Sequence, residues 1–164
     1  MSLSSETISS DSKVNCASNS LEQFILQALH DRGYTEFWNH KVQVYYNRKI
    51  IGGKQYARKV PLGDTIYESP READFLIINR DRFPNDLVIE CKWQQSKGSV
   101  DEKYPFLLYN IVRTGIPTVI LLDGGGYRPS ALKWLKDMVN KNGALTGVWT
   151  MAEFQKEVND GFLG

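Results

Sequence analysis

The chain has 164 residues, of which 41% are hydrophobic and 24% charged, and its net charge is +1. This length suits one domain with its own core, and the small net charge excludes a polycation that binds nucleic acid over its whole surface. No apolar run approaches the roughly 18 residues of a membrane helix. The two cysteines, Cys16 and Cys91, form no disulfide framework, so we expect a cytoplasmic protein.

The N-terminal segment is polar and rich in serine. Residues 1–19 lack the apolar region of a signal peptide and predict a flexible arm, followed by a single domain over residues 20–164. Ser20-Leu-Glu-Gln23 fits a capping box, and apolar residues then recur at helical spacing as far as Gly33. Glu22 lies at the border of this apolar stripe. Two interpretations remain open: a first-turn acid favoured by the helix dipole, or a carboxylate that reaches a functional site.

A strand and a basic hairpin are predicted next. Residues 40–47 alternate between apolar and polar side chains, which is typical of a strand with one solvated face. Residues 48–60 predict a hairpin that turns at Gly52-Gly53 and interleaves basic residues with a tyrosine. Its Lys54, Arg58 and Lys59 are candidate contacts to a phosphate backbone. The alternative is a solvated hairpin whose charged edges discourage aggregation.

Two short apolar runs then carry ionisable side chains. Residues 73–78 and 86–93 predict strands, and their short polar connection predicts an antiparallel hairpin. Glu90 and Lys92 are two residues apart and therefore lie on one face. Asp74 begins the preceding strand, where it can meet Glu90 across the ladder at a Cβ separation of about 5 Å. Burying such charges is costly unless they pair or bind a metal.

The rest of the chain alternates helices and strands. Ser99-Val-Asp-Glu102 fits a second capping box, before a helix in which Pro105 predicts a kink. Residues 118–122 predict a central strand, and the glycines that follow it lack the lysine of a P-loop, so they are better explained as a turn.

The C-terminal third predicts two more helices around a last strand. Pro129 suits the start of a helix that runs to about Lys141, residues 147–149 predict the strand, and Thr150 caps the final helix. The predicted order is α-β-β-β-α-β-α-β-α. It describes an α/β fold with helices on both faces of a mixed central sheet.

The charged strand pair predicts a metal site. Mg²⁺ is held by one or two carboxylates, waters and substrate phosphate oxygens, so Asp74, Glu90 and the carbonyl of Cys91 are candidate ligands. Lys92 is a candidate to orient or deprotonate the attacking water, or to offset charge in the transition state. Gln94, on the same face, is a candidate to hold the water or a phosphate oxygen. The alternative is a structural Glu-Lys pair at a strand end.

Asp74, a hairpin turn and Glu90-Cys-Lys92 together resemble the PD-(D/E)xK nuclease superfamily, whose core is α-β-β-β-α-β. The triplets Asp11-Ser-Lys13 and Asp101-Glu-Lys103 have the same spacing but lie outside apolar strands, so the resemblance depends on the position of Glu90-Cys-Lys92 in a strand. The resemblance covers roughly residues 20–125. The departure is that Ala73 replaces the proline of the motif, a position that supplies no ligand. The segment from Gln94 to Lys103 is similar to one in some type II restriction endonucleases.

The resemblance implies hydrolysis of DNA phosphodiester bonds with Mg²⁺, for which Mn²⁺ can substitute. It assigns Asp74 and Glu90 as metal ligands, Lys92 as the catalytic lysine and Glu22 as the first-helix acid that many members add. Candidate phosphate contacts near the site are Arg71, Lys97, Lys103 and Arg128. The expected function is a type II restriction enzyme that acts on double-stranded DNA as a homodimer. A repair or junction-resolving nuclease, and a non-catalytic DNA-binding module, are the alternatives.

Overall fold

A computed structural model describes residues 10–36 and 53–164 of the chain. The described elements are, in order, α1 (Ser10–Asp31), β1 (Thr35–Glu36), β2 (Gln55–Asp64), β3 (Pro70–Ile78), β4 (Leu87–Trp93), the 3₁₀ helix η1 (Ser99–Glu102), α3 (Lys103–Thr114), β5 (Thr118–Asp123), α4 (Pro129–Asp137), β6 (Leu145–Trp149) and α5 (Met151–Asn159). None of the helices in these ranges combines the length and hydropathy that a transmembrane segment requires.

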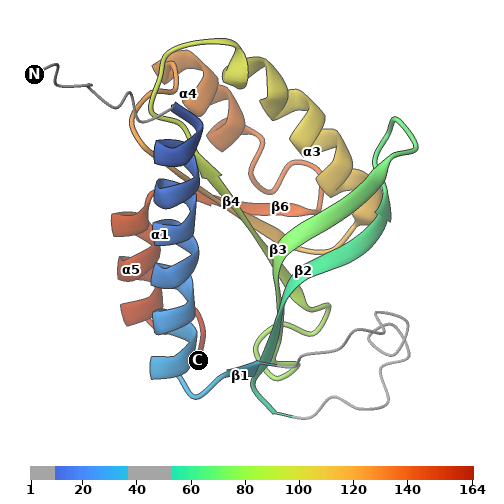
Figure 1. The fold of residues 1–164 in the computed structure, drawn as a ribbon. Helices are drawn as coiled ribbons and strands as arrows, with labels where there is room; N and C mark the ends of the chain where they lie inside the picture. The colour runs from blue at the N-terminus through green and yellow to red at the C-terminus, as the bar shows by residue number, and fades with distance from the viewer. Residues whose placement is uncertain (1–9, 37–52) are drawn as a thin grey trace, which may run out of the picture.

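The strands form one mixed sheet in the order β1-β2-β3-β4-β5-β6. β2, β3 and β4 pair antiparallel, whereas β4, β5 and β6 pair parallel. Helices α1 and α5 lie side by side on one face of the sheet, and α3 and α4 lie on the other (Figure 1). The predicted α/β class, with a mixed central sheet flanked by helices, is therefore confirmed.

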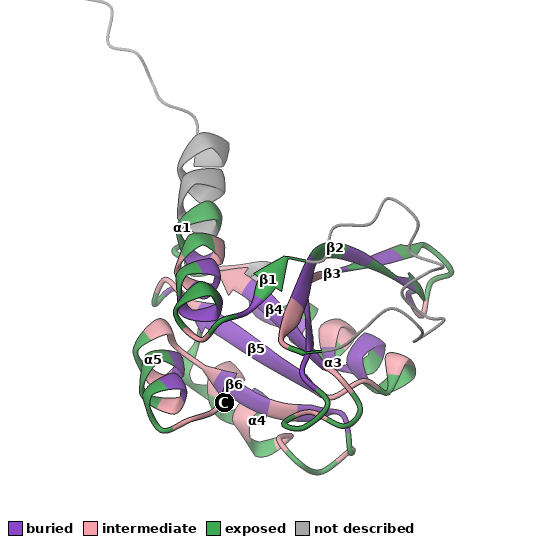
Figure 2. Ribbon diagram, turned by 90° about the horizontal axis from the view of Figure 1, so that it is seen from below, coloured by how far each residue is buried: buried purple, intermediate pink, exposed green. Residues whose placement is uncertain are grey.

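Apolar packing on both faces explains why the central strands are apolar without alternation. On the α1 face, Leu21, Ile25 and Leu29 pack in one buried cluster with Phe75 and Ile89. A second cluster on the other face joins side chains of α3, α4, β5 and β6. Figure 2 shows β4 and β5 as largely buried ribbons between these layers. Charged groups inside β4 must therefore find partners within the protein.

The first helix is longer than predicted. It begins at Ser10, so residues 10–19 are helical rather than a flexible arm, and residues 1–9 lie outside the described residues. Ser20 is consequently an interior residue and not the helix cap. This corrects the explanation of Glu22 as a first-turn acid, because that residue lies more than two turns inside the helix.

The first of the three antiparallel strands is β2 rather than the predicted strand at residues 40–47. That segment, and the Gly52 end of the predicted hairpin turn, lie outside the described residues. The hairpin that the structure describes instead joins β2 to β3 through residues 65–69, and it forms the long twisted ribbon of Figure 1. The predicted antiparallel pairing of β3 with β4 is confirmed.

Of the two later capping boxes that were predicted, the structure confirms one. The four residues of the box at Ser99 form the 3₁₀ helix η1 itself, and α3 begins only at Lys103, with Glu102 as an N-cap that makes no side-chain cap bond. Pro105 therefore lies in the first turn, where its missing N–H leaves no helical bond unmade, and no kink is required. The box at Thr150 is confirmed, since its hydroxyl accepts from the Glu153 amide and the Glu153 carboxylate accepts in return.

The glycines after β5 permit a close approach of two backbones. Gly126 N–H donates to the Gln94 carbonyl at 2.7 Å, and a Cβ at Gly126 would lie 2.5 Å from the Gln95 carbonyl carbon. Gly124 has a φ of +101°, which other residues rarely adopt. Packing and turn geometry thus account for the glycine run without a bound nucleotide.

Replacing Gly126 by alanine should lower the free energy of unfolding by about 1–3 kcal/mol, because the added methyl group meets backbone atoms that cannot swing aside. The measurement is urea denaturation followed by circular dichroism. Gly98→Ala is the matched control, since a Cβ there meets nothing within 4 Å and φ is not positive. Equal stability of the two variants would contradict the close approach.

Candidate active site

Asp74 lies where β3 diverges from β4. The paired residues of these strands run from Ile77 opposite Leu87 to Phe75 opposite Ile89. One step further, the Cys91 amide donates to Asp74 Oδ2 at 2.8 Å. The Asp74 carboxylate thus accepts the hydrogen bond that a carbonyl of β3 would accept in a regular ladder. This bond holds the carboxylate at the opening between the two strands. The carbonyl of Cys91 lies on the same edge of β4 as its amide, facing this opening.

Glu90 is buried and tied to α3 by an arginine. Its side chain is 4% exposed, and its Oε1 accepts from Arg71 Nη2 at 3.0 Å. Arg71 also donates to the Asn110 carbonyl at 2.7 Å and to Thr114 Oγ1. These bonds compensate the cost of burying both charges. They also join β3, β4 and α3 at one point.

Lys92 lies between the two predicted acids. Its Nζ is 3.3 Å from Glu90 Oε2 and 3.8 Å from Asp74 Oδ2, and its side chain is 39% exposed. Burial acts to lower the pKa of Lys92, but the charges of Glu90 and Asp74 outweigh it and raise that pKa above the ordinary value. Lys92 is therefore a cation at neutral pH, with access to solvent.

A second lysine lies on the other side of Asp74. Arg58 pairs with Phe75 and Val60 with Ala73 in the ladder, which places Lys59 opposite Asp74. Its Nζ lies 2.7 Å from Asp74 Oδ1 and 2.7 Å from Glu22 Oε1. Glu22 therefore joins the predicted site from α1, but through Lys59.

The pKa of Lys59 is also raised. Burial lowers it, but the hydrogen bonds to Asp74 and Glu22 have the larger combined effect. The described site is thus a row of alternating charges: Glu22, Lys59, Asp74, Lys92, Glu90 and Arg71.

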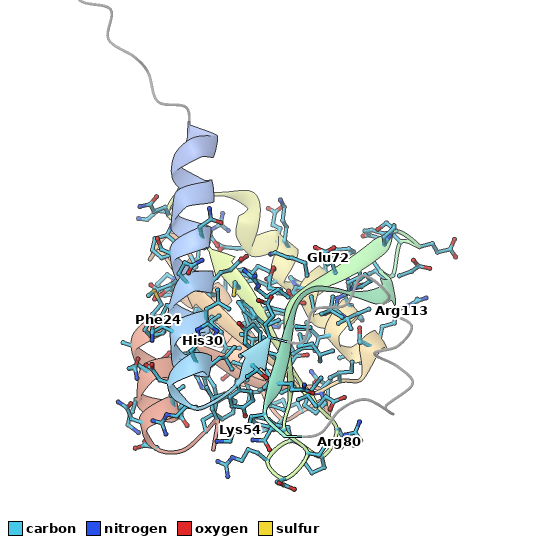
Figure 3. All side chains as sticks on the ribbon, turned by 60° about the horizontal axis from the view of Figure 1, so that its bottom comes forward. Phe24, His30, Lys54, Glu72, Arg80 and Arg113 are labelled. Carbon is cyan, nitrogen blue, oxygen red and sulfur yellow. The ribbon has the colours of Figure 1, made fainter. Side chains whose placement is uncertain are left out.

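A cavity of about 390 Å³ opens beside Lys92, between the β2–β3 hairpin and α3. Its lining includes Glu90, Lys92, Trp93, Lys103 and Phe106. In Figure 3, Glu72, another lining residue, and Arg113 lie at the right, whereas Lys54 and Arg80 lie along the lower edge of the molecule. The cavity gives a substrate access to the Glu90-Lys92 face of β4.

Gln94 does not take the predicted place. It is 3% exposed, its Nε2 donates to Asp101 Oδ1 at 3.0 Å and more weakly to the Gly126 carbonyl at 3.4 Å, and its Oε1 accepts from the hydroxyl of Tyr104. With both N–H groups engaged and the side chain buried, this amide has no donor left for a phosphate oxygen. The prediction for Gln94 is corrected: the residue joins β4, α3 and the glycine turn.

Three of the predicted phosphate contacts have partners within the protein. Arg71 is buried and bonds to Glu90, and Lys59 is held by the two acids described above. Lys54 Nζ binds the carbonyls of Arg32, at 3.0 Å, and Gly164. The burial of Arg71 corrects its prediction, whereas the contacts of the partly exposed Lys54 and Lys59 to phosphate stay predictions.

The other basic candidates differ in their surroundings. Arg58 forms a two-pronged ion pair with Glu36, at 2.6 and 3.1 Å. Lys97 and Lys103 are exposed, and Lys103 lines the cavity. Arg128 is exposed with its Nε 3.4 Å from Asp101. All four are exposed at least in part, so Arg58, Lys97, Lys103 and Arg128 remain predicted phosphate contacts.

The thiol of Cys91 has no part in this chemistry. It packs in the apolar cluster beneath α1, and burial raises the pKa of the thiol, so the group stays protonated. A protonated, buried thiol is neither a nucleophile nor a metal ligand. Only the main chain of Cys91 faces the opening beside Asp74.

The comparison with protein families adds an independent finding. A family model described as the PD-(D/E)XK nuclease superfamily domain matches residues 13–162. The chain belongs to the PD-(D/E)XK nuclease superfamily. Neither the curated proteins nor the solved structures yielded a match. The superfamily predicted from Asp74 and Glu90-Cys-Lys92 is confirmed, and membership supports a nuclease that acts on nucleic acid.

Nucleases of this superfamily generally use divalent metal ions. Within residues 10–36 and 53–164, no three histidine, cysteine or acidic side chains converge on one point. Mg²⁺ needs only one or two carboxylates, the remaining ligands being waters and substrate oxygens. Glu22 and Asp74 direct oxygens at a single position, 2.7 Å from the same nitrogen. This pair of hard donors fits such an ion.

Proposed function

We propose that the chain is a Mg²⁺-dependent endonuclease that hydrolyses phosphodiester bonds in double-stranded DNA, with Mn²⁺ able to replace Mg²⁺. The observation that carries the proposal is the Asp74-Lys92-Glu90 cluster, where two carboxylates lie within 4 Å of one partly exposed ammonium beside a cavity. A structural ion pair alone would need neither the exposure of Lys92 nor the opening between β3 and β4.

Each residue of the cluster has a separate proposed task. Asp74, Glu90 and the carbonyl of Cys91 are the proposed metal ligands, with Glu22 as an additional acid. The ion, when bound, would lower the pKa of a water and neutralise charge on the phosphoryl group. Lys92 would bind a non-bridging phosphate oxygen and offset the charge that develops there. Arg71 would hold Glu90 in place from behind.

In the proposed reaction the water oxygen forms a bond to phosphorus and the bond from phosphorus to the 3′ oxygen breaks. The water loses its proton to solvent, and the 3′ oxygen gains one, so the products are a 5′-phosphate and a 3′-hydroxyl. Lys97, Lys103 and Arg128 are proposed contacts to neighbouring phosphates, and they would position the strand without reading its sequence.

We further propose that the chain acts as a type II restriction enzyme. Two copies related by a twofold axis would cut both strands of a palindromic site, which favours a homodimer. A cytoplasmic location is proposed with it, since Cys91 is a free buried thiol, as expected in a reducing compartment. A repair or junction-resolving nuclease and a non-catalytic DNA-binding module are the alternatives that the following experiment separates.

Plasmid DNA incubated with the protein and Mg²⁺ should be converted to linear fragments, and excess EDTA should abolish the reaction because the ion supplies the activated water. Asp74→Ala and Lys92→Ala should be inactive under the same conditions. Discrete fragments would favour restriction, and preferential cutting of a four-way junction would favour a resolvase. Tight DNA binding without metal-dependent cutting of any substrate would leave only the binding module.

A further inference from the structure

The ammonium of Lys59 lies between two carboxylates that come from different layers of the fold. Glu22 belongs to α1 and Asp74 to β3, and each places an oxygen 2.7 Å from Lys59 Nζ. The two acid side chains are 18% and 17% exposed, whereas that of Lys59 is 48% exposed. Asp74 is also held by the Cys91 amide, while the lysine reaches both acids from the surface.

The backbone at Lys59 is bent to make this contact. Its φ is +49°, in the left-handed region that residues other than glycine rarely adopt, and it lies inside a strand. Arg58 and Lys59 are both exposed between the buried Ala57 and Val60, so the normal alternation of a strand is broken at this point. Strained backbone persists where the surrounding structure enforces it, and such positions cluster at functional sites.

The same oxygens are the ones that fit a divalent ion. A lysine ammonium held at hydrogen-bond distance from both acids neutralises them and fills the position toward which both are directed. A divalent ion at Glu22 and Asp74 would be repelled by that ammonium unless the side chain moved. Lys59 can move, because its four-carbon stem is flexible and half of the side chain already faces solvent.

Lys92 differs from Lys59 in this respect. It lies 3.3 and 3.8 Å from its two acids, and one of them, Glu90, is held by Arg71 regardless of Lys92. Its removal therefore would not free a pair of carboxylates.

We infer that Lys59 competes with the divalent ion for Glu22 and Asp74, and that binding of the ion releases the Lys59 side chain into solvent. The inference rests on the proposed function, in that it takes Asp74 to be a metal ligand. It adds to that function a residue outside the motif that sets the strength of metal binding.

The test is calorimetric titration of Mn²⁺ into protein freed of metal by EDTA dialysis, without DNA. Lys59→Met should bind Mn²⁺ roughly threefold to tenfold more tightly than the wild type, as expected for the loss of two partly exposed ion pairs. Lys59→Arg keeps the competing charge and should stay within about twofold of the wild type on the same grounds. Lys59→Gly offers a second neutral variant that suits the positive φ, should Lys59→Met fold poorly.

Arg58→Met is the matched control, because it removes a neighbouring cation that pairs with Glu36 rather than with the site. Because Arg58 also interacts with the charge of Glu22 without a hydrogen bond to it, its Mn²⁺ affinity should rise by less than about twofold, well below the gain for Lys59→Met. A second readout is thermal melting in EDTA: Lys59→Met should melt lower than the wild type, and added Mn²⁺ should raise its melting temperature by more.

Two results would overturn the inference: no gain in affinity for either neutral variant, or an equal gain for Arg58→Met. If the wild type binds Mn²⁺, Asp74→Asn abolishes binding and Lys59→Met changes nothing, the proposed function stands and this inference alone is lost. If no variant binds Mn²⁺ but the wild type cleaves DNA with Mg²⁺, the inference alone is lost; if the protein neither binds Mn²⁺ nor cleaves DNA, both are lost.

Discussion

Replacing Arg71 by methionine is expected to lower the free energy of unfolding by about 3–5 kcal/mol, the usual cost of removing one member of a buried ion pair. The substitution leaves Glu90 with a buried charge and removes donors to the Asn110 carbonyl and to Thr114 on α3. Both side chains of the pair are at most 6% exposed, so water cannot easily replace the lost partner. The measurement is urea denaturation of the purified variant.

A double variant, Arg71→Met with Glu90→Leu, separates the ion pair from simple packing. It removes both charges together, so it should be more stable than Arg71→Met alone. Arg113→Met is the surface control, since that side chain is exposed near the end of α3, and it should change stability by less than about 0.5 kcal/mol. Equal losses for Arg71→Met and the double variant would argue against a buried, charge-dependent link between β4 and α3.

The acids and the motif lysine of the site could be predicted from the sequence because they interrupt apolar strands. Asp74, Glu90 and Lys92 are charged residues in segments whose neighbours are buried, and a period of two fixes the relative faces of the last two. The same logic predicted β5 and the final helix cap. These features depend on residues close together in the chain, where periodicity carries the information.

The partners of those charges could not be predicted, because they depend on contacts between distant segments. Arg71 lies 19 residues before Glu90, and Lys59 lies 37 residues after Glu22. From the sequence, both residues are predicted to contact phosphate, as expected of basic residues near a nucleic-acid site. A signal for Lys59 did exist, since two successive basic residues between apolar ones break the alternation of β2.

The position of Gln94 could not be predicted from the rule that residues two apart in a strand lie on the same face. It shares the parity of Glu90 and Lys92, but β4 ends at Trp93, and beyond that residue the period of two no longer applies. The chain there turns toward the glycine loop, where Gln94 N–H bonds to the Asp123 carbonyl and its own carbonyl accepts from Gly126. The period of two predicts the face of a side chain only within the strand, and the residues at which strands end are hard to predict from sequence.

Lys92→Met should lower the rate of DNA cleavage by about 10²–10³-fold, the effect expected when a preorganised group that stabilises developing charge is removed. Lys92 lines the cavity, and its Nζ lies within 4 Å of the two proposed metal ligands Glu90 and Asp74. The measurement is single-turnover cleavage of a labelled duplex at saturating Mg²⁺, with the DNA affinity determined separately in Ca²⁺. Lys92→Arg, which keeps the charge, should recover part of the rate, and Lys133→Met on the exposed face of α4 should leave it unchanged.

A loss of DNA affinity as large as the loss of rate would show that Lys92 binds the ground state rather than the transition state. A selective loss of rate would favour a role for Lys92 in the chemical step.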